Sequence, residues 1–205
     1  RFDMSEYNHE QSDQRLVGAP PGYVGYEAGG QLTNAVKAKP FCVLLFDEIE
    51  KAHGKILDKF LQILEDGRLT DGKGETVSFS ETIIIFTSNI GAAEVKPGDD
   101  AKKVKEEFIS AVKSHFVDKL GRPELLNRIG NNIVAFNFIS DPEIFIKIAK
   151  GKFKPVSDFL KEKHNCEIEF SDENSLFTAI SNAADISNGG RGLLNQIEDK
   201  IITPL

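Results

Sequence analysis

Phe41-Cys42-Val43-Leu44-Leu45-Phe46-Asp47-Glu48 joins six apolar residues directly to two adjacent carboxylates. An unbroken apolar run of this length, with β-branched and aromatic members, predicts a central parallel strand that is covered on both faces. Parallel sheets carry their chemistry at the carboxyl ends of the strands. One carboxylate there can hold Mg²⁺ through its water shell, and a second can orient or deprotonate a water aimed at a phosphate. An apolar strand that ends in a polar turn would give the same string, so other residues have to decide.

A second strand of the same kind follows a predicted helix. Thr82-Ile83-Ile84-Ile85-Phe86-Thr87-Ser88-Asn89 is again an apolar run with a polar end. The helix before it has apolar residues three and four positions apart, namely Ile56, Leu57, Phe60, Leu61, Ile63 and Leu64. Two parallel strands joined by a helix bring their carboxyl ends to one crevice, so Asp47, Glu48 and Asn89 are expected to meet. Asparagine is also common as a helix cap, but its pairing with two carboxylates favours the functional interpretation.

The segment Gly18–Gly30 contains five glycines and two prolines, so it is predicted to be a loop. Glycines on both sides of Tyr23 let the backbone bend tightly and present that ring outward. The alternative is a turn whose tyrosine folds back onto the core. A short helix over Gln31–Val36 is expected to end before Pro40.

The remaining elements follow from periodicity and from helix start signals. Apolar residues recur every four positions from Val104 to Leu120 and predict a helix. Ser140-Asp141-Pro142-Glu143 is a strong helix start with proline at the first position, and Pro155 is expected to interrupt the long helix that begins there. The other predicted elements are strands at 1–4, 132–138 and 167–170, a helix start at 5–7, a helix to about 164, one from about 172 and one from 191. The predicted domain boundary lies near Ser140.

Composition excludes several classes of protein. With 205 residues, 40% of them hydrophobic, the chain can bury a substantial core, and its net charge of −7 argues against a binder of duplex nucleic acid. Cys42 and Cys166 offer no disulfide framework and indicate a reducing compartment. No signal peptide or membrane-length apolar run is present, so a soluble, cytoplasmic protein is expected.

The chain begins with Arg1 rather than Met, which indicates a piece of a longer protein. The four histidines show no metal-ligand spacing: His9, His53, His115 and His164.

Five stretches, in their order and spacing, resemble the second ATPase module of the Clp-type AAA+ unfoldases, the family of ClpA, ClpB and ClpC. They are GAPPGYVGYEAGGQLTNAV (18–36), LLFDEIEKAH (44–53), FLQILEDGRLTDGKG (60–74), TIIIFTSNIG (82–91) and RPELLNRIG (122–130). The resemblance covers residues 1–140 and continues more loosely to Leu205. It implies an α/β AAA+ parallel-sheet core, truncated at its N-terminus, over residues 1–139. A small, mostly helical lid, incomplete at its C-terminus, is implied over residues 140–205.

The resemblance implies roles for residues that match the family's motifs. Asp47 and Glu48 correspond to the Walker B pair, in which the first supports Mg²⁺ and the second activates the attacking water. Asn89 matches the sensor-1 residue that positions this water near the γ-phosphate. Arg128 matches the arginine finger, which reaches into the neighbouring subunit's site and neutralises transition-state charge. Arg122 is a rival for that role and is interpreted as structural.

Two further regions match the family. Arg191 stands where the family has its sensor-2 arginine, which contacts phosphate from the lid. Tyr23, followed by Val24, falls at the pore-loop aromatic that grips a threaded polypeptide, because an aromatic ring can pack on any side chain without reading sequence. The loop Asp66–Gly74 resembles a second pore-facing loop. Surface arginines near helix ends are ordinary, so a structural role remains the alternative for Arg128 and Arg191.

The chain also departs from the family. The phosphate-binding loop GxxxxGK[ST] occurs nowhere in it, so the chain as given is expected to bind ATP weakly, to lack meaningful ATPase activity and to form no stable hexamer. In addition, Gly189-Gly190-Arg191-Gly192 replaces the usual Gly-Ala-Arg-Pro. These changes leave the subfamily, and with it the substrate, open.

For the parent protein the resemblance implies an ATP- and Mg²⁺-dependent unfoldase or disaggregase, a homo-hexamer that threads protein substrates and works with adaptor proteins, without nucleic acid or membrane partners. A specialised relative that dismantles secretion sheaths would share every motif named here. A catalytically silent scaffold that lost its phosphate loop is the alternative from another class, and the retention of Glu48, Asn89 and Arg128 argues against it. A nucleic-acid motor would share the Walker B core but not the glycine-flanked Tyr23 loop.

Overall fold

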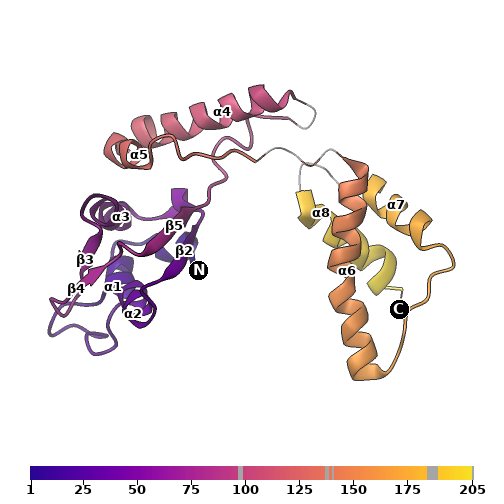
Figure 1. The fold of residues 1–205 in the computed structure, drawn as a ribbon, viewed down its shortest axis with the longest axis horizontal. Helices are drawn as coiled ribbons and strands as arrows, with labels where there is room; N and C mark the ends of the chain where they lie inside the picture. Colours follow the sequence, from indigo (N-terminus) through magenta and orange to yellow (C-terminus); the bar gives the residue numbers. More distant parts are fainter. Residues whose placement is uncertain (97–98, 137–138, 140, 184–188, 205) are drawn as a thin grey trace. The chain divides into compact units, whose positions relative to one another are not determined.

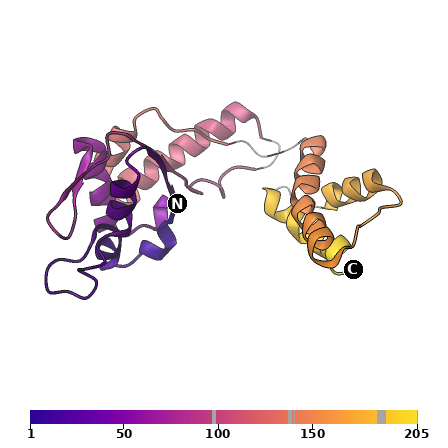
Figure 2. The same cartoon turned by 60° about the horizontal axis from the view of Figure 1, so that its bottom comes forward.

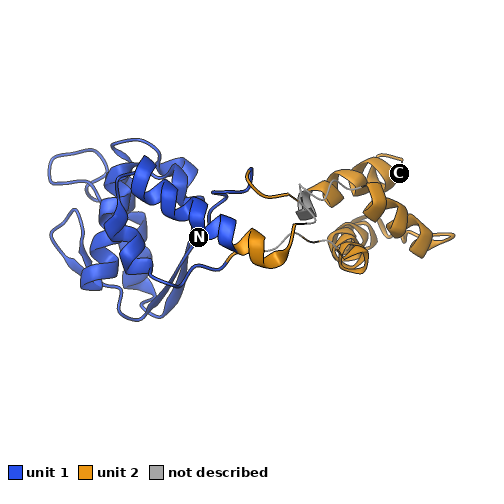
Figure 3. Ribbon diagram, turned by 90° about the horizontal axis from the view of Figure 1, so that it is seen from above, with its two compact units in different colours: residues 1–93, 106–134 blue, residues 94–105, 135–205 orange. Residues whose placement is uncertain are grey.

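The computed structural model describes residues 1–96, 99–136, 139, 141–183 and 189–204, apart from the side chains of residues 189–191. The chain divides into two compact units, residues 1–93 with 106–134 and residues 94–105 with 135–205 (Figure 3). Each unit has its own hydrophobic core. The domain boundary between residues 139 and 140 remains a prediction, and Ser140 lies outside the described residues.

Three parallel strands form the main sheet of unit 1 in the order β1-β2-β5 (Figure 1). Their bounds are Phe2–Asp3 for β1, Cys42–Asp47 for β2 and Thr82–Phe86 for β5. The central position predicted for β2 is therefore confirmed. Phe46 lies opposite Phe86 in the register, so β2 and β5 end at the same edge of the sheet. That edge is where the predicted site residues follow the strands.

One face of this sheet carries the core of unit 1. Phe46 is fully buried, and the centroid of its ring lies 4.5 Å from that of the Phe60 ring. The other face is exposed to solvent. The exposed fractions of its side chains are 57% for Val43, 62% for Ile83 and 44% for Ile85. The expectation that both faces are covered is therefore wrong for the described residues. Side chains alternate along a strand, so an apolar run supplies two apolar faces whether or not a helix packs on each.

Helices precede and follow the strands of unit 1, and most of α4 also belongs to this unit. Four of them were not predicted as full elements, since only a helix start at 5–7 was expected: the 3₁₀ turns η1 and η2 and the helices α1 and α5. The bounds are Met4–Tyr7 (η1), Ser12–Val17 (α1), Gln31–Ala38 (α2), Ile49–Lys51 (η2), Gly54–Asp66 (α3), Ala101–Ser114 (α4), His115–Lys119 (η3, a π turn) and Pro123–Ile129 (α5). The predicted stripe of α3 faces the core, where Ile56, Leu57, Phe60 and Ile63 are buried.

A short hairpin begins within the segment 66–74, which was predicted only as turns, and extends beyond it. Strands β3 (Arg68–Thr70) and β4 (Thr76–Ser78) pair antiparallel after α3. Leu69 and Val77 lie opposite each other and are buried, while their neighbours face solvent. Three-residue strands are too short for a period of two to be read from sequence alone.

Two predicted strands are absent from the described residues. Residues 132–136 form no strand, and residues 137–138 lie outside the description. Residues 167–170 also form no strand; there Ile168 and Phe170 pack against the core of unit 2. A strand exists only where a neighbour accepts and donates its backbone hydrogen bonds, and no described strand pairs with either segment.

Unit 2 is built from α6 (Pro142–His164), α7 (Glu173–Ala183), α8 (Gly189–Ile197) and the π turn η5 (Glu198–Ile202). The predicted start of α6 is confirmed, because the Asp141 side chain caps the helix by accepting from the Glu143 N–H at 2.9 Å. The predicted interruption at Pro155 is wrong: α6 runs through it. Phe145, Ala149 and Phe153 are buried in the unit's core, and this packing holds the helix where proline removes one backbone hydrogen bond. Within the described part of the chain, no helix has the length and apolar character needed to cross a bilayer.

Candidate active site

Thr87 joins the ends of strands β2 and β5. Its hydroxyl donates to Asp47 Oδ1 at 2.7 Å and accepts from the Glu48 N–H at 3.2 Å. Its backbone N–H donates to the carbonyl of Phe46 at 2.9 Å. Sequence reasoning did not select Thr87. A polar residue directly after the apolar run of β5, level with Asp47 across the sheet, was the signal that could have found it.

Asp47 is held as a carboxylate at this edge. The hydrogen bond from the Thr87 hydroxyl, followed by that from the Arg1 guanidinium, holds the pKa of Asp47 below its usual range. Its other oxygen, Oδ2, forms an ion pair with Arg1. An ionised carboxylate beside a hydroxyl provides the oxygen donors that Mg²⁺ prefers, directly or through its bound waters. The chemistry of Asp47 and Thr87 therefore fits a magnesium site.

Glu48 adopts a left-handed backbone conformation, with φ 55° and ψ 55°. This region is uncommon for residues other than glycine, and such outliers gather at functional sites. The conformation sends the side chain toward the end of β5, where Oε1 accepts from the Asn89 amide Nδ2 at 3.2 Å. Oε2 pairs with Lys51 Nζ at 2.5 Å. The structure thus brings Glu48 and Asn89 into direct contact, and a carboxylate acceptor and an adjacent amide can together bind and orient one water next to them.

The two candidate arginines of α5 lie on surface ion pairs. Arg128, in the last turn of the helix, pairs with Glu65 of α3 at 2.9 Å and is exposed. Arg122, which precedes the helix, pairs with Asp58 of α3 at 2.9 Å. Neither contact involves Asp47 or Glu48. Arg191 belongs to the first turn of α8, and its side chain lies outside the described residues.

The predicted loop Gly18–Gly30 contains no helix or strand. Tyr23 is 61% exposed and Val24 is fully exposed at its tip. The ring therefore does not fold back onto the core. The base of the loop is tight, because a Cβ on Gly30 would lie 2.1 Å from the Val17 carbonyl carbon. A loop with a fixed base and an exposed aromatic tip is suited to contact something outside unit 1.

The loop between β3 and β4 is hydrogen-bonded to this glycine-rich loop. Both loops project from the same side of unit 1 (Figure 2). Lys73 donates from Nζ to the Glu27 carbonyl at 3.0 Å. Asp71 is buried beneath it and accepts from Lys37 Nζ at 2.6 Å. Burial opposes ionisation of Asp71, yet Lys37 and the backbone N–H groups of Glu75 and Lys73 outweigh it and hold the pKa of Asp71 below its usual range. The two loops thus form one contact surface.

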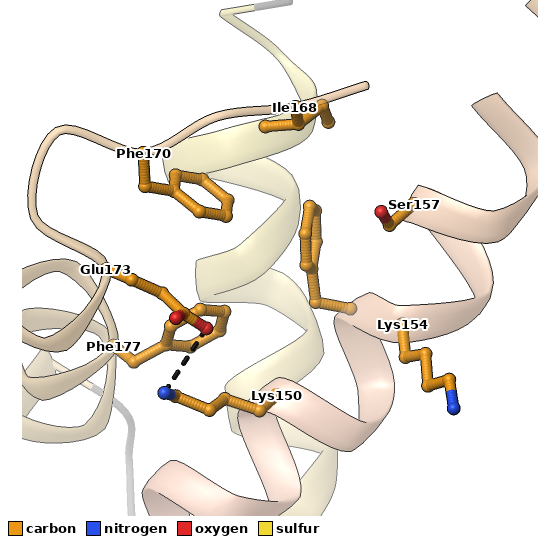
Figure 4. Close-up of a pocket in the computed structure, with 8 residues that line it drawn as sticks. Lys150, Lys154, Ser157, Ile168, Phe170, Glu173 and Phe177 are labelled. Carbon is orange, nitrogen blue, oxygen red and sulfur yellow. Dashed lines mark ion pairs between the residues drawn. The ribbon is translucent and has the colours of Figure 1, made fainter. Parts of the chain in front are cut away.

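A cavity of about 420 Å³ lies wholly within unit 2 (Figure 4). Three phenylalanines contribute to its apolar lining, and two other lining residues, Lys150 and Glu173, form an ion pair at 3.2 Å. The lining residues are Lys150, Phe153, Lys154, Ser157, Ile168, Phe170, Glu173 and Phe177. None of them is a predicted site residue. In the ranges that the structure describes, no group of three or more His, Cys, Asp or Glu side chains is arranged to bind a metal.

Comparison with known proteins gives concordant results. A family model described as AAA domain (Cdc48 subfamily) matches residues 1–132. The chaperone protein ClpB of Meiothermus ruber is 43% identical over 209 residues, which cover 100% of this chain and 23% of that protein. ClpB of Clostridium tetani is 44% identical over 209 residues, with the same coverage of 100% and 23%. The chain therefore spans about a quarter of the length of these curated relatives.

A solved structure resembles the whole chain. It is a closed-state cryo-EM reconstruction of Hsp104 with ATPγS and FITC-casein, and its TM-score is 0.83 at 34% sequence identity. The match covers 99% of this chain and 34% of that one.

Proposed function

Because the chain belongs to the AAA domain family (Cdc48 subfamily), we propose that it is part of an ATP-dependent protein disaggregase or unfoldase. The observation that carries this proposal is the contact between Glu48 and Asn89, 3.2 Å apart at the shared end of two parallel strands. A strained glutamate beside an amide, next to an ionised aspartate, supports hydrolysis of a bound nucleotide.

Each residue has a role in this proposal. Asp47, ionised and oriented by Thr87, would hold Mg²⁺, and the ion would supply positive charge to neutralise the phosphates. Glu48 accepts a proton from the attacking water, and the Asn89 amide orients that water. Arg128 leaves its exposed ion pair with Glu65 and reaches into the nucleotide site of a neighbouring subunit of a homo-hexamer. Arg191, in unit 2, contacts phosphate.

The substrate in this proposal is an unfolded polypeptide. Tyr23 and Val24 are exposed at the tip of a loop whose base is fixed, so they can press against any passing side chain. ClpB relatives are chaperones by name, and the Hsp104 structure holds FITC-casein. These two facts support a protein substrate for the machine to which this chain contributes. Adaptor proteins would be further partners.

The test is steady-state ATP hydrolysis by the full-length protein that contains this chain. Glu48→Gln keeps the size of the side chain but removes the general base, so turnover should fall by about 100-fold or more while ATP binding persists. Glu81→Gln, at an exposed glutamate just before β5, is the matched control and should keep wild-type turnover. Equal turnover in wild type and Glu48→Gln would contradict the proposal. ATP binding without turnover in the wild type would favour the silent scaffold.

A further inference from the structure

Glu50 accepts a hydrogen bond from the backbone of Asn89, whereas Glu48 accepts one from its side chain. It lies in the 3₁₀ turn η2, two residues after Glu48, and its Oε1 accepts from the Asn89 N–H at 3.0 Å. Its second oxygen, Oε2, is buried without a hydrogen-bond partner among the described residues. Leaving a buried carboxylate oxygen unpaired costs stability. Packing alone therefore does not explain a glutamate at position 50, because its unpaired oxygen lowers the stability of the fold.

The turn after β5 is clamped on its other side by α4. Gly91 has φ +84°, and a Cβ there would lie 2.8 Å from Ala111 Cβ and 3.1 Å from Phe108 Cδ1. The backbone from Asn89 to Gly91 is thus contacted by Glu50 at one end and by α4 at the other. These contacts hold the backbone on both sides of Asn89, and its side-chain amide reaches Glu48 Oε1 at 3.2 Å.

His115 begins the π turn η3 that follows α4, and its Nε2 is also buried without a hydrogen-bond partner in the described part of the chain. Burial first, and the charge of Lys119 second, lower the pKa of His115, while the charge of Glu50 raises it. The lowered pKa keeps the imidazole neutral near pH 7. A neutral His115 does not compete as a cation for the Glu50 carboxylate, which stays directed at the Asn89 N–H.

We propose that Glu50 is a positioning residue for the hydrolysis reaction: it fixes the backbone of Asn89 so that the Asn89 amide meets Glu48. This inference rests on the proposed function, because it assigns Glu50 to the same site. A positioning residue acts on the rate of the chemical step and not on nucleotide affinity, since a displaced orienting group chiefly misplaces the attacking water.

Three substitutions at Glu50 in the full-length protein separate the hydrogen bond from the charge. Glu50→Gln keeps an acceptor at the same reach and should retain turnover within about 3-fold of wild type. Glu50→Asp keeps the charge but is one methylene too short, and Glu50→Ala removes both; for these two, kcat should fall by about 10- to 100-fold with KM nearly unchanged. Glu10→Ala, which removes an exposed ion pair with Lys55, is the matched control and should leave kcat unchanged.

Hydrogen–deuterium exchange of the segment 87–91 is the readout that does not depend on activity. The Asn89 N–H should exchange faster in Glu50→Asp and Glu50→Ala than in wild type and Glu50→Gln. Retained kcat in Glu50→Asp with lost kcat in Glu50→Gln would overturn the inference, because the charge would then matter. Unchanged exchange in Glu50→Asp would overturn it as well. A wild-type protein without turnover would refute the proposed function, and the exchange data would still decide whether Glu50 fixes Asn89.

Discussion

Glu48 and Asp71 are two residues of unit 1 whose local geometry affects its stability. Glu48 occupies a left-handed conformation that costs about 1–3 kcal/mol for a residue with a side chain. The hydrogen bonds that Thr87 makes to the Glu48 N–H and to Asp47 hold this conformation in place. Asp71 has an ordinary backbone but a buried carboxylate, which Lys37 and two backbone N–H groups satisfy. Glu48 thus stores backbone strain at the candidate active site, whereas Asp71 stabilises the loop between β3 and β4.

Replacing Asp71 by asparagine should destabilise unit 1 by about 1–3 kcal/mol at pH 7, because the substitution removes a charge-assisted bond to Lys37 from a buried position. The folded-state pKa of Asp71 is lowered, so its stabilisation is present above the unfolded value of 3.8 and is lost as pH falls through the folded pKa. The difference between wild type and Asp71→Asn should therefore shrink below pH 3.8.

Thermal unfolding at pH 7 and pH 3 measures this difference. Glu75→Gln is the matched control, since Glu75 contacts the same lysine from a side chain that is 65% exposed. That variant should change stability by about 0.5 kcal/mol or less. A difference in stability between wild type and Asp71→Asn that stays constant from pH 7 to pH 3 would contradict a stabilising role for the ionised Asp71 carboxylate.

At the scale of elements, the two loops of unit 1 are held together by backbone contact. Gly72, in the β3–β4 loop, donates its N–H to the Val17 carbonyl at 3.3 Å. A Cβ on Gly72 would lie 2.4 Å from the Ala19 carbonyl oxygen and 2.6 Å from backbone atoms of Gly18. Backbone atoms cannot move aside as a flexible side chain can. The hairpin therefore fixes the base of the loop that carries Tyr23.

Gly72→Ala should destabilise unit 1 by about 1–3 kcal/mol, because the new methyl group overpacks this contact. Gly151→Ala makes the same chemical change inside α6, where a Cβ meets nothing within 4 Å, and should stabilise unit 2 by up to about 1 kcal/mol. Urea unfolding monitored separately for each unit compares the two. A Gly72→Ala protein as stable as wild type would show that the loops are not in contact.

For the whole molecule, the decisive feature is the absence of any GxxxxGK[ST] string from its 205 residues. Backbone N–H groups and the lysine of that loop make most phosphate contacts in nucleotide sites of this type. The 205-residue chain alone should therefore bind ATP more weakly than micromolar and should hydrolyse none. It should also stay below hexamer size, because nucleotide bridges subunits in such rings.

Isothermal calorimetry with MgATP and light scattering with and without nucleotide test these expectations. A micromolar dissociation constant, or a ring-sized species, would contradict them. The longer protein used for the hydrolysis assay is the natural comparison, since it contains the same Asp47, Glu48 and Asn89.

Long apolar runs and helix start signals made much of the fold predictable. The runs at 41–46 and 82–86 gave two parallel strands, and Asp141-Pro142-Glu143 located the start of α6. The meeting of Glu48 with Asn89 followed from parallel strands sharing a carboxyl edge. These features are local or follow from one topological rule, so a single sequence contains enough information for them.

Other features were decided only by tertiary structure. Residues 132–136 have the composition of a strand but pair with no strand among the described residues. Arg68–Thr70 and Thr76–Ser78 have little strand signal but pair with each other. The roles of Thr87 and Glu50 depend on hydrogen bonds that link residues about 40 positions apart. By itself, the sequence determined the type of sheet, the helices with a clear apolar face and the identity of the acidic pair. The tertiary structure decided strand pairing, the exposed sheet face and the contacts that orient Asn89, because each requires a partner that neighbouring residues cannot supply.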